Sequence, residues 1–224
     1  MRLAVWDVDG TLVDSRAVIF DCCSYALVEI GLPAPTYDAV RQIVGLSLEH
    51  ALSILAPGLN AAEVARVADS YKIRFHEHRA RPGFIEPLYD GAAETLRRLK
   101  AEGWRMAIAT GKSRRGVEMI VQMHGWEDMF GSTHCADDGP GKPHPAMLLE
   151  AMRVNGARPE QTVMIGDTAH DIRMAKSAHT RALGVSWGFN TADELNAAGA
   201  HHVATDFIML NKRLNEFSKA LITP

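Results

Sequence analysis

Short apolar runs recur along the chain, and each has the length of a strand covered on both faces of a sheet. These runs are Leu3–Trp6 and residues 106–109, 163–165 and 182–185. Patterns with helical spacing lie between them. Residues 91–103 place Ala92, Leu96 and Leu99 on one side, and residues 145–155 carry an apolar stripe that ends at Gly156. Alternating strand and helix patterns predict an α/β fold built on a doubly wound parallel sheet.

One region interrupts this alternation. From residue 16 to residue 80 the pattern is helical throughout, with apolar positions at helical spacing at Val64, Val67, Ala68, Tyr71 and Phe75. A cluster of turn-forming residues then follows at Pro82, Gly83, Pro87, Asp90 and Gly91. We therefore predict a Rossmann-like core of residues 1–15 and 81–224, with residues 16–80 inserted as a small all-helical cap domain.

Composition narrows the class of protein. The 224 residues are 47% apolar and 23% charged, which excludes a disordered chain, and the net charge of −3 does not suggest a nucleic-acid partner. No apolar run approaches the length of about 20 residues needed to cross a bilayer, so no membrane partner is expected. The three cysteines, Cys22, Cys23 and Cys135, lack the spacing of a disulfide framework. We expect a cytoplasmic protein that is a monomer or a homodimer.

Polar residues follow several of the predicted strands directly. Asp7 and Asp9 follow the first strand, Thr110 the second and Asp167 a later one, while Lys142 lies in a predicted loop. Ligands of open parallel sheets bind beyond the carboxyl ends of the strands, where these side chains would meet. Carboxylates gathered there would repel one another unless a cation were present, and Mg²⁺ prefers oxygen ligands. A lysine and a hydroxyl beside them suit a phosphoryl group.

These residues also form recognisable motifs. The segment Asp7-Val8-Asp9-Gly10-Thr11-Leu12-Val13-Asp14 resembles the first motif of the haloacid dehalogenase-like (HAD) superfamily. Thr110 resembles the second motif, and Lys142 in Gly141-Lys142-Pro143 resembles the third. The fourth motif is similar to the segment Gly166-Asp167-Thr168-Ala169-His170-Asp171. The resemblance spans essentially the whole chain, with the motifs in order. Within the superfamily, the phosphoglycolate phosphatases, which carry a helical cap after the first motif, are the most similar members.

The resemblance implies a catalytic mechanism with an aspartyl-phosphate intermediate. Asp7 would attack phosphorus, and Asp9 would act as general acid and then as general base. Thr110 and Lys142 would bind the phosphoryl oxygens. The resemblance also implies Mg²⁺ as cofactor, held by Asp7, Asp9 through its backbone carbonyl, and Asp167. Asp171, one helical turn after Asp167, would reach a metal-bound water or orient Lys142.

Three further residues are expected to contact the substrate. Arg41 and Gly45 resemble a cap segment that faces the active site, and Gly111 is next to Thr110. Many phosphoglycolate phosphatases have Asn where this chain has Gly111, so the assignment to one substrate is weakened. The basic residues Lys112, Arg114 and Arg115 follow Thr110 directly. For them a solvated helix face is favoured over contact with an anionic substrate.

Taken together, these patterns predict a phosphatase that hydrolyses a small phosphorylated metabolite, most like phosphoglycolate phosphatase. Pyrophosphatase, nucleotidase, sugar phosphatase and β-phosphoglucomutase-like activities remain open, since a mutase would also keep Asp9. Haloacid dehalogenases and phosphonatases lack this second aspartate. A non-enzymatic receiver-like phospho-switch also combines Asp, Thr and Lys around Mg²⁺. That alternative predicts a chain of about half this length with no helical insert.

Overall fold

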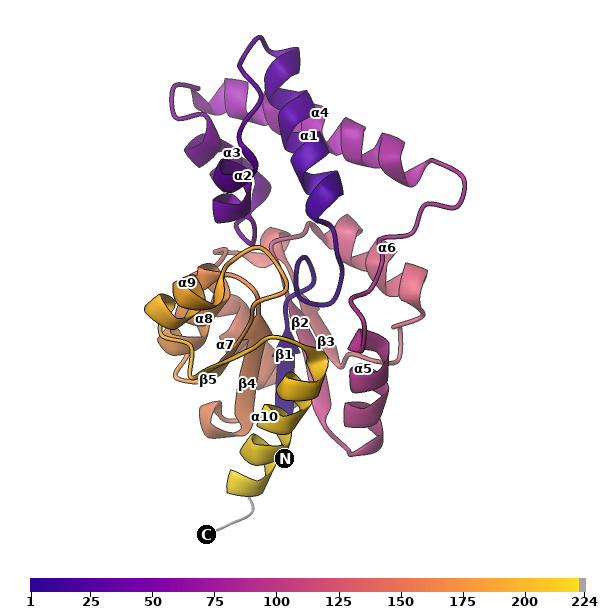
Figure 1. Cartoon of the computed structure of the whole chain (residues 1–224), viewed down its shortest axis with the longest axis vertical. Helices are drawn as coiled ribbons and strands as arrows, with labels where there is room; N and C mark the ends of the chain where they lie inside the picture. The colour runs from indigo at the N-terminus through magenta and orange to yellow at the C-terminus, as the bar shows by residue number, and fades with distance from the viewer. Residues whose placement is uncertain (222–224) are drawn as a thin grey trace.

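The computed structural model describes residues 1–221, and they form a six-stranded, fully parallel sheet beneath a group of helices (Figure 1). The strand order is β3-β2-β1-β4-β5-β6. The strands are β1 (Leu3–Trp6), β2 (Arg105–Ala109), β3 (Ser132–His134), β4 (Thr162–Gly166), β5 (Arg181–Val185) and β6 (His202–Ala204). The predicted α/β fold with a parallel sheet is therefore confirmed.

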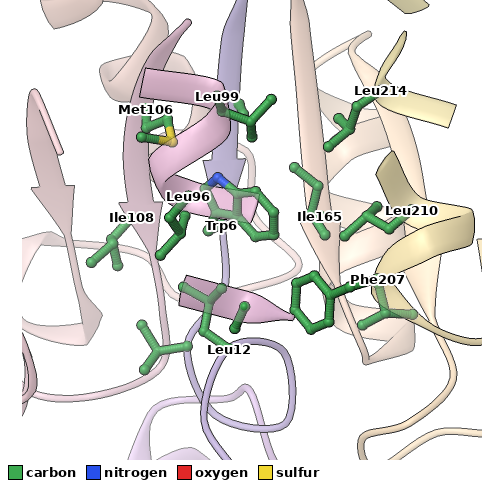
Figure 2. Packing of buried hydrophobic residues seen from close by; sticks show 14 of the residues in the cluster. Trp6, Leu12, Leu96, Leu99, Met106, Ile108, Ile165, Phe207, Leu210 and Leu214 are labelled. Atoms are coloured by element: carbon green, nitrogen blue, oxygen red, sulfur yellow. The ribbon is translucent and has the colours of Figure 1, made fainter. Parts of the chain in front are cut away.

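Both faces of the sheet are buried, which explains the uninterrupted apolar run of its central strand. Ala4 and Trp6 point into the apolar cluster on one face, and Leu3 and Val5 point into the cluster on the other. Figure 2 shows the first cluster, in which Trp6 packs among side chains from neighbouring strands and helices. The helices on this face are α5 (Ala92–Ala101), α6 (Arg114–His124) and α10 (Phe207–Ala220). The other face is covered by α7 (Ala146–Asn155), α8 (Ala169–Ser177) and α9 (Ala192–Ala198).

The four predicted strands are confirmed, and two further strands were not predicted. β3 and β6 have three residues each and lie at the edges of the sheet. The sequence of β3 is Ser-Thr-His, so it carries no apolar run to detect. The predicted helices at 91–103 and 145–155 correspond to α5 and α7, and Gly156 ends α7 in the left-handed conformation, with φ of 61°. Single 3₁₀ turns occur at Ala136–Asp138 and Pro159–Gln161.

The inserted region contains α1 (Arg16–Glu29), α2 (Tyr37–Ile43), α3 (Leu48–Leu55) and α4 (Ala61–Arg79). These four helices, here called the cap, lie beyond one end of the sheet (Figure 1). Asn60 and Glu63 form a reciprocal capping box at the start of α4, which stabilises this long helix by about 1 kcal/mol. The helix then packs along α1 through a separate apolar cluster that includes Leu27 and Val67. The cap therefore has a core of its own.

The chain enters and leaves the cap at adjacent points. Val13 pairs with Leu88 in an antiparallel bridge. On either side of it, the Asp14 amide donates to the Pro87 carbonyl at 2.8 Å and the Tyr89 amide donates to the Leu12 carbonyl at 3.0 Å. The two linkers are thus hydrogen-bonded to each other where they join the core.

A second contact joins the cap to the core. Arg41 of α2 forms an ion pair with Glu194 of α9 at 2.8 Å, and the Gln42 side chain donates to the same carboxylate at 2.7 Å. The ring of His170 lies 3.1 Å from the Gln42 carbonyl oxygen. This contact, here called the latch, holds α2 against the start of α8 and α9. Within residues 1–221, no helix has the length and apolarity that a membrane crossing requires.

Candidate active site

The carboxyl ends of β1, β2 and β4 meet beneath the cap and bring the predicted site residues together. Asp7, Thr110 and Asp167 each follow the end of one of these strands. A cavity of about 430 Å³ lies between this edge and the cap, and Asp7, Asp9 and Thr110 line its core side. The arrangement agrees with the rule that open parallel sheets bind ligands at this edge.

A tight loop after β1 positions the two aspartates. The amides of Leu12 and Val13 both donate to the Val8 carbonyl, at 2.9 and 3.0 Å, and so fold residues 8–13 back on themselves. Gly10 has a φ of +78°, and a Cβ atom there would lie 2.2 Å from a carboxylate oxygen of Asp167. Only glycine fits this position, because it tolerates the left-handed conformation and leaves room for the neighbouring carboxylate.

Lys142 lies beneath the floor of the cavity, where its side chain is fully buried between two carboxylates. Its Nζ atom is 2.9 Å from Asp7 Oδ1 and 2.6 Å from Asp171 Oδ1. Burial alone would lower the pKa of Lys142, but the charges of Asp171 and Asp7 outweigh it, and the pKa lies above its ordinary value. Lys142 is therefore a fixed positive charge next to Asp7. Asp171, predicted to orient this lysine, contacts it directly and also caps α8 through Thr168.

Three of the predicted metal ligands gather in one place. Carboxylate oxygens of Asp7, Asp167 and Asp171 lie within 4.8 Å of one another, and all three residues are buried. Asp167 accepts hydrogen bonds from the Thr11 hydroxyl at 2.9 Å and the Phe189 amide at 2.8 Å. Burial, followed by the charges of Asp7 and Asp171, raises the pKa of Asp167 well above its ordinary value. A cation would relieve this repulsion.

The donor set fits a hard divalent cation. All the candidate ligand atoms are carboxylate oxygens, and Asp7 Oδ2 is buried without a hydrogen-bond partner. The side chain of Asp9 does not belong to this group of carboxylates. Asp9 would therefore contribute to a metal site through its backbone carbonyl, which is the atom that the family resemblance implies.

The Asp9 carboxylate instead contacts Lys112, which also lines the cavity. Lys112 Nζ lies 2.8 Å from Asp9 Oδ1 and 3.1 Å from Glu86 Oε2, and the lysine side chain is 7% exposed. Burial raises the pKa of Asp9; Lys112 opposes this rise, and the charge of Glu86 adds to it. The preference for a solvated helix face was wrong for Lys112, because this residue precedes the first residue of α6 and turns inward. Arg114 instead pairs with Asp138, and Arg115 is exposed at the cavity rim.

Glu86 and Arg79 belong to the same network, and neither was predicted from the sequence. Arg79, the last residue of α4, lies 2.8 Å from Glu86 Oε1, and the Glu86 side chain is fully buried. Burial favours the neutral acid, but the charge of Lys112 and the contact with Arg79 outweigh it and lower the pKa of Glu86. Glu86 lies in the segment that returns from the cap, between Gly83 and Pro87. An acidic residue in such a segment carries no signal of burial in the sequence alone.

Gly45 and Gly111, which were predicted to contact the substrate, line the cavity, but Arg41 does not. Gly45, with φ of +94°, and Gly111 both line the cavity. A Cβ atom at position 111 would lie 2.7 Å from the carbonyl oxygens of Gly45 and Leu46, so the missing side chain lets the cap approach the core. Arg41 is not part of the cavity lining and instead forms the latch with Glu194. The structure therefore does not bring Arg41 to the site.

A second group of candidate metal ligands lies within the cap. It consists of Asp21, Cys22 and His78. The Asp21 carboxylate already contacts Arg74 at 2.8 Å and His78 at 2.6 Å. Burial raises the pKa of the Cys22 thiol to about 12, which disfavours the thiolate that binds metals. These contacts describe an ion-pair network that joins α1 to α4.

Comparisons with known proteins agree with this fold and identify the family. Residues 4–185 match the model of the family described as "Haloacid dehalogenase-like hydrolase", and the chain belongs to that family. It is 36% identical over 209 residues to a "Probable phosphatase IndB" from Dickeya dadantii, which covers 92% of this chain and 90% of the relative. It is 31% identical over 216 residues to a "Phosphoglycolate phosphatase" from Psychrobacter arcticus, covering 93% and 94%.

A solved structure shares the whole arrangement. The crystal structure of a putative haloacid dehalogenase-like hydrolase from Bacteroides fragilis aligns with a TM-score of 0.84 and 27% identity. The alignment covers 93% of this chain and 98% of that protein, so the cap and the core are both included. The chain is thus a hydrolase of the haloacid dehalogenase-like family, with the helical cap and the parallel core that its relatives share.

Proposed function

We propose that this hydrolase is a Mg²⁺-dependent phosphatase that cleaves phosphate monoesters through an aspartyl-phosphate. One observation carries the proposal: Asp7 and Asp9 line the same cavity but have different surroundings. Asp7 belongs to the carboxylate cluster and contacts Lys142, whereas Asp9 lies outside that cluster and contacts Lys112. Two carboxylates in distinct environments can serve as nucleophile and as acid–base group.

In the first step, a carboxylate oxygen of Asp7 attacks phosphorus and the bond from phosphorus to the ester oxygen breaks. The Asp7 carboxylate lines the cavity, where it can meet a phosphoryl group. The leaving alkoxide takes its proton from Asp9, and the raised pKa of Asp9 favours the protonated form that this role needs. The Thr110 hydroxyl can donate to a phosphoryl oxygen, since Thr110 lines the cavity beside both aspartates.

In the second step, Asp9 accepts a proton from a water molecule that attacks the aspartyl-phosphate. Inorganic phosphate leaves, and both aspartates return to their first state. Lys142 keeps a positive charge next to Asp7 throughout. Bound Mg²⁺ would offset negative charge on the phosphoryl oxygens, and Asp7, Asp167 and the Asp9 backbone carbonyl are the groups that would hold it.

The test is hydrolysis of p-nitrophenyl phosphate, with phosphoglycolate as a reference because of the relative from Psychrobacter arcticus. We expect turnover with Mg²⁺, no turnover with a chelator, and none in Asp7→Asn. Asp193→Asn is the matched control, since Asp193 is exposed at the start of α9. Absence of turnover by the parent protein with Mg²⁺ would refute the proposal. Conversion of a sugar phosphate to its isomer without release of phosphate would instead identify a mutase.

A further inference from the structure

The cavity is large for phosphoglycolate or pyrophosphate. Its volume of about 430 Å³ falls in the range of about 300–1,000 Å³ that is typical of pockets for drug-sized ligands. Phosphoglycolate adds only a two-carbon acid to its phosphoryl group, and pyrophosphate adds only a second phosphoryl group. Most of the space beyond Asp7 and Thr110 would remain unfilled with either compound bound.

The wall that faces this space is mostly apolar and comes from the cap. It includes Ile19 of α1, Val44 and Leu46 after α2, Ala51 of α3, and Tyr71 and Phe75 of α4. Val44, Leu46 and Ala51 are themselves buried, so the wall is held by packing within the cap. An apolar group bound there would lose contact with water on several sides, which favours its binding.

The cations that lie inside the cavity are already paired with a carboxylate. Among the described residues that line the cavity, the cations with little exposure are Lys112 and Arg79, and both contact the buried carboxylate of Glu86. They flank the ring of Phe75, at 5.4 and 4.4 Å from its centroid. Lys72, His76 and Arg115 also line the cavity but are exposed at its rim. Burying a carboxylate or a second phosphoryl group against the apolar wall would leave that charge poorly compensated.

We infer that the substrate is a phosphate monoester whose alcohol half is apolar, an alkyl or aromatic group that fills the space beneath the cap. This inference rests on the proposed phosphatase activity and adds the chemical class of the leaving group. The phosphoryl group lies at Asp7 and Thr110, and the apolar group lies against Val44, Leu46 and Phe75. Selection of the substrate is then a property of the cap, while the core carries out the reaction.

The experiment compares hexyl phosphate, methyl phosphate and phosphoglycolate, none of which has an activated aryl leaving group. We expect kcat/KM for hexyl phosphate to exceed that for each of the other two by about tenfold or more, since each methylene in an apolar pocket adds discrimination. Hydrolysis of methyl phosphate or phosphoglycolate with no preference for hexyl phosphate would overturn the inference but leave the phosphatase proposal intact. Failure to hydrolyse any ester, p-nitrophenyl phosphate included, would instead refute the phosphatase proposal.

Two substitutions test the position of the apolar group. Val44→Thr keeps the shape of the wall but adds a hydroxyl, and Ala51→Leu fills part of the space. Each should lower the ratio of kcat/KM for hexyl phosphate to kcat/KM for methyl phosphate several-fold. Val28→Thr makes the same change as Val44→Thr at a side chain that is 55% exposed, and should leave the ratio unchanged. An unchanged ratio in both wall variants, with melting temperatures close to that of the parent, would place the group elsewhere.

Discussion

At the scale of single residues, Asp9 is distinguished from Asp7 by the charges that it contacts. Lys142 holds Asp7 in the carboxylate cluster, while Lys112, from the turn after β2, contacts Asp9. Because Lys112 also contacts Glu86, the position of the proposed acid–base group, Asp9, depends on a residue in the returning linker. The chemistry of the core is therefore connected to the cap through one buried carboxylate.

Replacing Asp9 by Asn should leave substrate binding largely intact and lower kcat by about 10²- to 10⁴-fold, because an amide cannot supply the proton or accept it back. Steady-state kinetics with an alkyl phosphate measures this effect, since its alkoxide needs protonation more than an aryl oxide does. The Asp193→Asn variant serves as the control. Equal kcat values for Asp9→Asn and the parent protein would contradict the role given to Asp9.

Replacing Glu86 by Gln should lower the free energy of unfolding at neutral pH by about 3 kcal/mol, because Lys112 and Arg79 lose a buried partner. The folded protein lowers the pKa of Glu86, so its carboxylate stabilises the fold above its ordinary pKa and this contribution is lost as the pH falls. The difference between variant and parent should therefore shrink below about pH 4.5.

Urea unfolding at a series of pH values measures this difference. Glu94→Gln is the control, because Glu94 forms an exposed ion pair with Arg97 in which both side chains are at least 67% exposed. Little change is expected in that variant at any pH. A cost of Glu86→Gln that stays constant from neutral to acidic pH would show that the charge of Glu86 does not stabilise the fold.

At the scale of elements, the cap and the core approach each other closely between the turn after β2 and the turn after α2. Gly111 and the carbonyl groups of Gly45 and Leu46 meet there with no side chain between them. Replacing Gly111 by Ala should push the two turns apart. A displacement of about 1 Å near a catalytic group can cost about 100-fold in rate, so we expect a large loss of kcat/KM.

The matched control is Gly58→Ala in the turn after α3, where an added Cβ atom would meet nothing within 4 Å. Both variants should remain folded, as judged by circular dichroism. Full activity in Gly111→Ala would show that the cap can adjust its position without loss, and that the close approach of the two turns is not required for catalysis.

The sequence was sufficient to predict the strands, helices and site residues that a local pattern of residues marks. The buried strands appear as apolar runs, the glycine that ends α7 appears directly after its apolar stripe, and Asp7, Thr110 and Asp167 lie at strand ends. Lys112 and Glu86 could not be placed in this way, because their burial depends on how the cap folds back over the core. The same holds for β3, whose three residues form a strand only because β2 lies beside them.

At the scale of the whole molecule, the cap is attached by its paired linkers and by the latch. Arg41 and Glu194 are only partly buried, with side-chain exposures of 18% and 31%, so their ion pair contributes little to global stability. Its effect should be on the position of the cap, since it is the one ion pair between α2 and α9 in the described residues. Salt should weaken this contact, because partly exposed charges are screened.

Replacing Glu194 by Gln should speed amide hydrogen exchange in α2 by about two- to fivefold, in line with a partly exposed ion pair worth about 0.5 to 1 kcal/mol. The increase should be smaller at high ionic strength, where the parent protein has already lost much of the contact. Glu49→Gln removes an exposed ion pair within the cap and should leave exchange in α2 unchanged. Identical exchange rates in Glu194→Gln and the parent would show that the latch does not hold the cap.

The bridge between Val13 and Leu88 affects how this protein can evolve. Because both linkers join the core at one hydrogen-bonded point, insertions, deletions and substitutions between residues 16 and 80 need not disturb the strands on either side. The cap can then be exchanged or altered as one unit while the aspartates and Lys142 keep their positions. New substrates would become accessible by changing less than a third of the chain, while the catalytic residues of the core stay the same.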